Sequence, residues 1–448
     1  MRSRVVVAAA ILTAAWLAAY VPTIAGGFIK DDFGWIYHSR LTGWSSLYST
    51  FASAHVFYRP LVQLSFGVTE FVFGTNPVPY ALTNLALGLA CAAAIYHLSR
   101  RLGLAPWAAV VATAVWAFNF HGINMAIVWL SGRTSLLGTL FSVLAAMALV
   151  RNRGVAAGAF AFAAFLSKEE VVALPLIFTV WLMIDRSSLR ASIGSWIALG
   201  VYFVLRGYSG AVGIADAPPY YRFTFDPFHV ATNIAEYADR SMTLGTLLLI
   251  ATVIALRRLP AATSDDWRVV AKGVGWLLCG FAATVWLPVR SSLYAVFPSV
   301  GFALVVSALL TAIVRNAEPR HAWRVAVAGL VLPFLLLPVY WQRNVRWTEL
   351  RRLSTATIRA IQADALPNET LVVLEDDLSH RANFRHVFGP LLHEAAALHF
   401  DNRLALWIEP PPPEIESSTR PVNAAHIVTF RLVGGRIEPA RPATPAND

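Results

Sequence analysis

Long apolar segments recur along residues 1–341, separated by short charged or proline-containing breaks. Most segments are roughly 16 to 22 residues long, the length that a helix needs to cross the hydrocarbon core of a bilayer. The pattern predicts about eleven membrane helices, and the one at 154–167 is short for a full crossing. The predicted helices cover residues 5–25, 79–98, 106–121, 123–150, 154–167, 171–185, 191–206, 241–256, 272–288, 294–314 and 324–341.

Basic residues are distributed unequally between the two sets of breaks. With the N-terminus inside, every cytoplasmic break contains arginine, as the positive-inside rule requires. The opposite breaks hold fewer basic residues, and these lie beside acidic, aromatic or histidine residues. The sequence therefore predicts a multi-pass protein of a bacterial cytoplasmic (inner) membrane, with its N-terminus inside.

The composition changes abruptly after Tyr340. The remaining residues are charged and rich in proline, and short apolar segments alternate there with turn residues, which is typical of a small α/β domain. We therefore predict an all-α polytopic membrane domain at 1–341 and a small C-terminal extracytoplasmic α/β domain at 342–448. The expected strands of this domain are 371–375, 404–408 and 426–432, and its expected helix is 390–400.

The overall composition agrees with a membrane protein. Hydrophobic residues make up 57% of the chain, charged residues only 14%, and the mean hydropathy is +0.56, which excludes an ordinary cytosolic enzyme. The net charge of +10 comes from scattered arginines rather than a basic block, so we expect contact with bilayer lipid and no nucleic acid partner. Cys91 and Cys279 lie inside apolar segments, which argues against a disulfide or metal framework.

An acidic pair directly follows the first predicted helix, at Lys30-Asp31-Asp32. Carboxylates at a membrane surface suit a general base, because partial desolvation raises a carboxyl pKa toward the working pH. Adjacent residues on a helix point about 100 degrees apart, so we expect only one of the two to face a substrate. The alternative is that both aspartates cap an amphipathic helix that begins near Phe33.

Four cations interrupt the apolar pattern on the same predicted side of the membrane: Arg59, Arg133, Lys168 and Arg290. Arginine matches two phosphate oxygens with its planar fork, and Tyr294 lies one helical turn after Arg290 as a further donor. Aromatic-belt positions would explain Arg59 and the Arg290–Tyr294 pair equally well. For Arg133, the alternative is a structural ion pair with an aspartate of the first loop.

Two further polar residues belong to these motifs. His121 is a lone histidine at a helix end, for which a structural role is the simpler interpretation. Glu169 follows Lys168 in a segment that also reads as a helix cap, with Ser167 as the cap and Glu170 at the third position. Because all of the motifs fall on one side of the membrane, we expect them to share an outer site.

The order of these motifs resembles the membrane part of GT-C glycosyltransferases. The likeness is above all to bacterial relatives of the transmembrane and tetratricopeptide-repeat O-mannosyltransferases, without the repeats, and it covers about residues 1–345. The motifs are Asp-Asp at 31–32, Tyr-Arg-Pro-Leu at 58–61, Asn-Pro-x-x-Tyr-x-x-Thr-Asn at 76–84, Trp-Leu-Ser-Gly-Arg-Thr-Ser-Leu-Leu at 129–137, Ser-Lys-Glu at 167–169 and Arg-x-x-x-Tyr at 290–294.

This resemblance implies an inverting enzyme that moves a mannose-like hexose from a polyprenyl-phosphate-linked donor to an extracytoplasmic acceptor. The acceptor is a protein hydroxyl, a glycan or a lipid. By the same resemblance, Asp31 or Asp32 is the base, and the cations with Tyr294 stabilise the phosphate leaving group. No cofactor is implied beyond the donor. A divalent metal ion is compatible with the resemblance and has no further support in the sequence.

The sequence departs from the family pattern at two places, and these departures leave other classes of protein function open. The stretch 121–126 lacks the acidic residue that family members commonly have there, and residues 342–448 replace the expected helical repeats. The alternatives are a transporter or flippase of lipid-linked or envelope material, or a catalytically inactive envelope scaffold. Transporters usually place polar residues near the midplane and often show internal symmetry. The gathering of ionisable residues at one surface therefore favours the enzyme.

Overall fold

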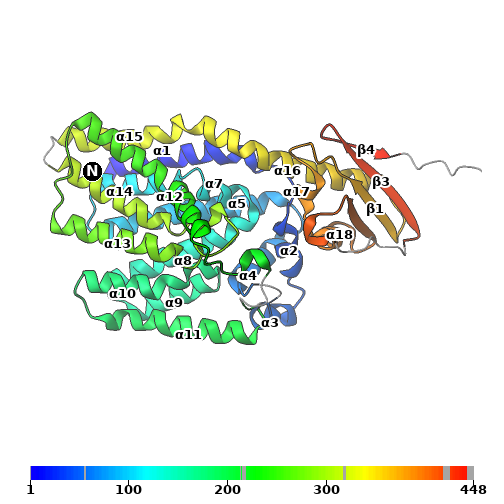
Figure 1. Cartoon of the computed structure of the whole chain (residues 1–448), viewed down its shortest axis with the longest axis horizontal. Coiled ribbons are helices and arrows are strands. Elements are labelled where there is room, and N and C mark those ends of the chain that lie inside the picture. Colours follow the sequence, from blue (N-terminus) through cyan, green and yellow to red (C-terminus); the bar gives the residue numbers. More distant parts are fainter. Residues whose placement is uncertain are drawn as a thin grey trace, which may run out of the picture.

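Apolar helices form an elongated bundle, and a small domain with a β-sheet lies at one end of it (Figure 1). The computed structural model describes residues 2–54, 57–211, 213, 218–315, 319–416 and 424–440. The bundle helices are α1 (Arg2–Tyr20), α5 (Pro77–Arg101), α6 (Pro106–Ala117), α7 (Gly122–Val128), α8 (Arg133–Val150), α9 (Gly154–Phe165), α10 (Leu174–Ile184), α11 (Ile193–Tyr208), α12 (Pro227–Leu256), α13 (Ser264–Phe281), α14 (Ser299–Val314), α15 (Pro319–Leu335) and α16 (Leu337–Ala363).

The fold class is as predicted: a largely helical polytopic protein with a small C-terminal mixed sheet. Within the described residues, six helical segments are long and apolar enough to cross a membrane, or seven if the bent pair α6 and α7 forms one span. Three shorter apolar helices accompany them: α4 (Pro60–Phe73), α9 and α14. Each predicted segment contains helix, but about eleven full crossings were expected.

The predicted helix at 123–150 is broken between α7 and α8. Trp129 is extended, and residues Leu130–Gly132 form a short 3-10 turn, η2. Gly132 permits this break, because a Cβ atom there would lie 2.5 Å from the carbonyl oxygen of Ala126. At the break, the N–H of Ser131 in the Ser-Gly-Arg motif donates to Oδ1 of Asp32 at 2.9 Å.

Two other helices differ from their predicted bounds. α12 begins at Pro227 rather than 241, because Asp226 caps it by accepting hydrogen bonds from the N–H groups of Phe228 and His229, each at 3.2 Å. The first half of α12 was not predicted, because its polar residues lower the average hydropathy of the segment. The predicted domain boundary at 341/342 falls inside α16, so the bundle and the C-terminal domain share one helix.

The C-terminal domain contains a four-stranded mixed sheet in the order β2-β1-β3-β4. The central strand β1 is parallel to β2 and β3, whereas β3 and β4 form an antiparallel hairpin through Gly434 and Gly435, both at positive φ. The three predicted strands are confirmed, and so is the helix at 390–400. The elements are β1 (Thr370–Glu375), α17 (Phe384–Phe388), α18 (Leu392–Phe400), β2 (Leu404–Glu409), β3 (His426–Val433) and β4 (Arg436–Ala440).

A shared hydrophobic core fixes this domain to the loop after α1. That loop forms the short helices α2 (Asp31–His38) and α3 (Trp44–Ala52) before α4. Phe33 of α2 stacks on Phe388 of α17 with ring centres 5.6 Å apart, and the N–H of Lys30 donates to the carbonyl of Val387 at 2.7 Å. The start of α2 is therefore held at the junction between the bundle and the C-terminal domain.

Candidate active site

A cavity of about 960 Å³ opens at this junction. Its walls come from α2, α4, the α7–α8 break, α12, the 3-10 turn η6 (Ser292–Ala295), α16 and the C-terminal domain. Cations outnumber carboxylates among the described lining residues by eight to two. The cations are Lys30, Arg59, Lys168, Arg240, Arg290, Arg343, Arg346 and Arg381, and the carboxylates are Asp31 and Glu394. The cavity therefore attracts anions.

The two aspartates of α2 have different surroundings. Asp32 is fully buried and lies outside the cavity lining. Its carboxylate accepts hydrogen bonds from the N–H of Ile29 at 3.1 Å and from the N–H and Oγ of Ser131 at 2.9 and 2.6 Å. Burial raises the pKa of Asp32 to about 6, although these hydrogen bonds oppose the shift. Asp32 thus joins α2 to the break between α7 and α8.

Asp31 instead faces the cavity and is accessible from it. The protein around the cavity desolvates its carboxyl group and raises its pKa, while the nearby charges of Lys30 and Arg59 lower it. No protein group among the described residues forms a hydrogen bond or ion pair with the Asp31 carboxylate. A carboxylate with a raised pKa and free oxygens has the properties required of a general base.

Arg59 lines the cavity next to the start of α4. Glu169 binds its Nε and Nη2 atoms at 2.7 and 2.6 Å and also lies 3.4 Å from Nη1 of Arg206. The guanidinium carbon lies 4.1 Å from the ring centre of Phe57. Glu169 is not part of the cavity lining. It binds Arg59 without facing the cavity itself.

Lys168 reaches the cavity from the loop between α9 and α10, and is only 4% exposed. Its Nζ donates to Oγ of Ser135 and lies 3.1 Å from Oε2 of Glu170. Burial lowers the pKa of Lys168 and raises that of Glu170, and each opposes the shift of the other. Neither Ser167 nor Glu170 caps a helix, because residues 169–173 form a 3-10 turn without a side-chain cap.

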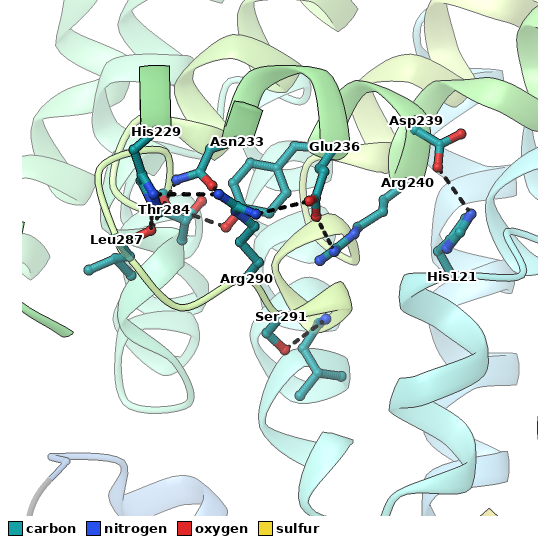
Figure 2. A network of polar contacts seen from close by, with 12 residues as sticks. His121, His229, Asn233, Glu236, Asp239, Arg240, Thr284, Leu287, Arg290 and Ser291 are labelled. Carbon is teal, nitrogen blue, oxygen red and sulfur yellow. Dashed lines mark hydrogen bonds and ion pairs between the residues drawn. The ribbon is translucent and has the colours of Figure 1, made fainter. Parts of the chain in front are cut away.

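Arg290 is held by three residues of α12 (Figure 2). Its Nε donates to Oδ1 of Asn233 at 2.7 Å, Nη1 to Oε1 of Glu236 at 3.1 Å, and Nη2 lies 3.4 Å from Nδ1 of His229. Glu236 also binds Arg240, one turn further along the helix. The network presents Arg240 and Arg290 together at the cavity wall.

Tyr294 and His121 also line the cavity. The Tyr294 ring centre lies 5.4 Å from Nζ of Lys168. Figure 2 shows His121 facing Asp239 of α12, with Nε2 3.6 Å from Oδ2. Its other ring nitrogen lies 3.3 Å from Nη2 of Arg343. His121 therefore connects α12 to α16 across the cavity.

Arg133 is the predicted phosphate-binding cation that does not line the cavity. It is fully buried, its guanidinium nitrogens donate to protein acceptors, and no ion pair joins it to Asp32 among the described residues. The acceptors are Oδ1 of Asn84 at 3.1 Å, the carbonyl and Oγ of Ser65 at 3.0 and 3.2 Å, Oγ1 of Thr69 at 3.2 Å and the carbonyl of Tyr80 at 3.1 Å. This placement favours a structural role over the predicted contact with phosphate.

Sequence reasoning missed several cations of the cavity. Arg343 and Arg346 lie three residues apart on α16, which the sequence assigned to the start of the tail. Arg240 lies on the half of α12 that was not predicted. Both helix segments could have been recognised in the sequence. Their polar residues recur at i, i+3 and i+4, a spacing that puts them on one face of a helix beside an apolar face.

Among the residues that the structure describes, no group of three or more His, Cys, Asp or Glu side chains lies close enough together to hold a metal ion.

Comparison with known proteins gives a structural likeness only. No family model matches the sequence, and no curated protein matches it. Two crystal structures of ArnT from Cupriavidus metallidurans are similar to the chain, one bound to undecaprenyl phosphate and one in the apo state. Each is 14% identical, covers 96% of this chain and 93% of its own, and gives a TM-score of 0.49. A likeness at this level does not establish a family.

Proposed function

We propose that this protein is a glycosyltransferase that moves a mannose-like hexose from a polyprenyl phosphate to an acceptor. The observation that carries the proposal is the convergence of Asp31 with Arg59, Lys168 and Arg290 on one cationic cavity, although they are far apart in sequence. A carboxylate among many cations suits a reaction that needs one base and produces a phosphate anion.

The proposed step is a single displacement at the anomeric carbon of the sugar. The Asp31 carboxylate accepts the proton of an acceptor hydroxyl while that oxygen forms a bond to the anomeric carbon. The bond from this carbon to the phosphate oxygen breaks, and its electron pair leaves with the polyprenyl phosphate. The configuration at the anomeric carbon is inverted. The acceptor is a protein hydroxyl, a glycan or a lipid.

The leaving phosphate gains negative charge in this step, so cations aimed at it stabilise the transition state. Arg59, Lys168 and Arg290 each have a carboxylate partner, which limits their net charge. Lys30, Arg343 and Arg346 have no such partner closer than 4.0 Å among the described residues. We therefore include Arg343 and Arg346 among the phosphate-binding candidates and assign Arg133 and Glu169 to supporting roles.

The distribution of arginine supports an outer location for the cavity. α5, α8 and α12 each start at the end of the bundle that carries the C-terminal domain and finish at the opposite end (Figure 1). Basic residues follow at that opposite end, at 100–101, 151–153 and 257–258. Because the positive-inside rule favours basic residues on the cytoplasmic side, we propose that the cavity and the C-terminal domain lie outside the cytoplasmic membrane of a bacterium. A cavity at the end of the bundle, away from its middle, also favours an enzyme over a transporter.

A transfer assay tests this function. Purified protein in nanodiscs is incubated with polyprenyl phosphates carrying labelled mannose, glucose or galactose, together with peptide, glycan and lipid acceptors. We expect release of polyprenyl phosphate and labelling of one acceptor class. Absence of both release and polyprenyl phosphate binding for every donor would contradict the proposal.

Sugar transfer should fall at high pH, when Lys168 loses its proton. Substitution of Glu170 by Gln is expected to shift this fall to a lower pH. The charge of Glu170 raises the pKa of Lys168 against burial, so removing that charge lets the ammonium lose its proton earlier. The measurement is kcat/KM against pH, with Glu438→Gln on exposed β4 as the matched control. A profile that stays unchanged in Glu170→Gln would show that Lys168 does not act as a cation in the reaction.

A further inference from the structure

Among the described residues of the cavity wall, one amide side chain faces the cavity without a protein partner. Gln63 lies on α4, one turn after Arg59, and is 8% exposed. Its side chain lines the cavity. Within the ranges that the structure describes, the side-chain amide forms no hydrogen bond, and only the backbone N–H is satisfied, by the carbonyl of Arg59 at 3.1 Å.

The other buried neutral side chains of the lining differ from Gln63 in this respect. Asn124 donates to Oδ1 of Asn344 at 2.7 Å, Ser131 to Asp32 at 2.6 Å, and Thr134 to the carbonyl of Ser131 at 3.1 Å. Their polar groups hold the fold together. The Gln63 amide is instead open to the cavity, so a ligand bound there can supply its hydrogen bonds.

The chemistry of the amide indicates the kind of ligand group. It is neutral and offers both a donor and an acceptor, as a hydroxyl group does. A phosphate accepts hydrogen bonds only, and the neighbouring Arg59 and Lys168 suit it better. One helical turn of about 5.4 Å separates Gln63 from Arg59, so a group bound at Gln63 lies next to an anion bound at Arg59.

We propose that Gln63 binds a hydroxyl group of the donor's sugar ring and thereby contributes to the choice of sugar. This inference rests on the proposed function, because it assumes that the anion beside Arg59 is the phosphate to which that sugar is attached. Gln63 is then a specificity-determining residue, and the cations around it bind the phosphate whether or not a sugar is attached.

The test compares the affinities of purified protein for bare polyprenyl phosphate and for polyprenyl phosphate carrying mannose, glucose or galactose. Gln63→Met keeps the size of the side chain and removes its hydrogen bonds. We expect the affinity for the bare phosphate to stay within about twofold, and that for at least one sugar-bearing lipid to fall about three- to tenfold. Gln362→Met, at an exposed position near the end of α16, is the matched control and leaves both affinities unchanged.

Each other outcome overturns the inference. Equal loss for bare and sugar-bearing lipid means that Gln63 acts on the phosphate or the fold, and the unfolding midpoint of Gln63→Met separates these two. No loss for any lipid means that water satisfies the amide. If wild-type protein binds the sugar-bearing lipids but Gln63→Met does so equally well, the proposed function stands without this subsite. If wild type binds no polyprenyl phosphate, both fail together.

Discussion

Substitution of Asp31 by Asn should lower the rate of sugar transfer by about 100- to 10,000-fold, because the variant lacks the group that accepts the acceptor's proton. The cations that bind the donor remain in place. We therefore expect the loss in kcat and not in donor affinity. Steady-state transfer and direct donor binding, measured on the same purified protein, separate the two quantities.

Asp32→Asn is the control for this prediction, because it changes the neighbouring carboxylate, which does not face the cavity. Asp32 makes three hydrogen bonds to protein donors and does not reach the cavity. An amide has one acceptor oxygen, so the substitution leaves at least one of these donors without its partner and lowers stability by roughly 1–3 kcal/mol. We expect Asp32→Asn to unfold at a lower temperature and Asp31→Asn to unfold like wild type. Full activity of Asp31→Asn would remove the base assignment.

The pH dependence follows from the same carboxyl group. Desolvation by the protein around the cavity raises the pKa of Asp31, so the base becomes protonated at a higher pH than an aspartate in free solution would. The wild-type rate should accordingly fall as the pH is lowered through this raised pKa, and the acidic limb should be absent from the residual activity of Asp31→Asn.

Substitution of Arg133 by Met should lower the free energy of unfolding by roughly 3–5 kcal/mol. The guanidinium group satisfies five acceptors from α4 and α5, and Met satisfies none of them. The buried side-chain oxygen of Asn84 then has no donor, which makes this loss larger than the average for a point substitution. The measurement is thermal or denaturant unfolding of the purified protein.

Arg153→Met is the matched control for this prediction. Arg153 is exposed at the opposite end of the bundle, so its loss should change stability by less than about 0.5 kcal/mol. If Arg133 bound the donor phosphate instead, Arg133→Met would lose donor affinity at a temperature where it remains folded, with little change in stability. That result would restore the role expected from the Ser-Gly-Arg motif.

Much of the fold could be predicted because its signals are local. Long apolar segments mark helices, and short apolar segments between turn residues mark strands such as β1 and β3. Where a helix contains polar as well as apolar residues, its mean hydropathy is too low to indicate a membrane helix. The first half of α12 was missed for this reason. The long helix α16 was cut short for the same reason, because its second half is charged where it enters the C-terminal domain.

The site was less predictable because its geometry depends on distant contacts. Helical periodicity indicated that only one residue of the pair Asp31 and Asp32 would face a substrate, but the choice depends on Ser131, about a hundred residues later. Arg133 was the most prominent cation in its motif, yet its acceptors lie between residues 65 and 84. Either an anionic ligand or carbonyl groups of the same chain can offset the cost of burying an Arg side chain. Only the packing around the side chain shows which of the two is present.

The central claim is that the cationic cavity binds the phosphate of a polyprenyl lipid. The most direct measurement compares the affinities of purified wild-type protein for polyprenyl phosphate and for the uncharged polyprenol of the same length. The claim predicts that the phosphate binds at least about 100-fold more tightly. It also predicts that Arg346→Met reduces this preference while Arg359→Met, an exposed change on the same helix, does not. Equal affinity for the phosphate and the alcohol would contradict the account.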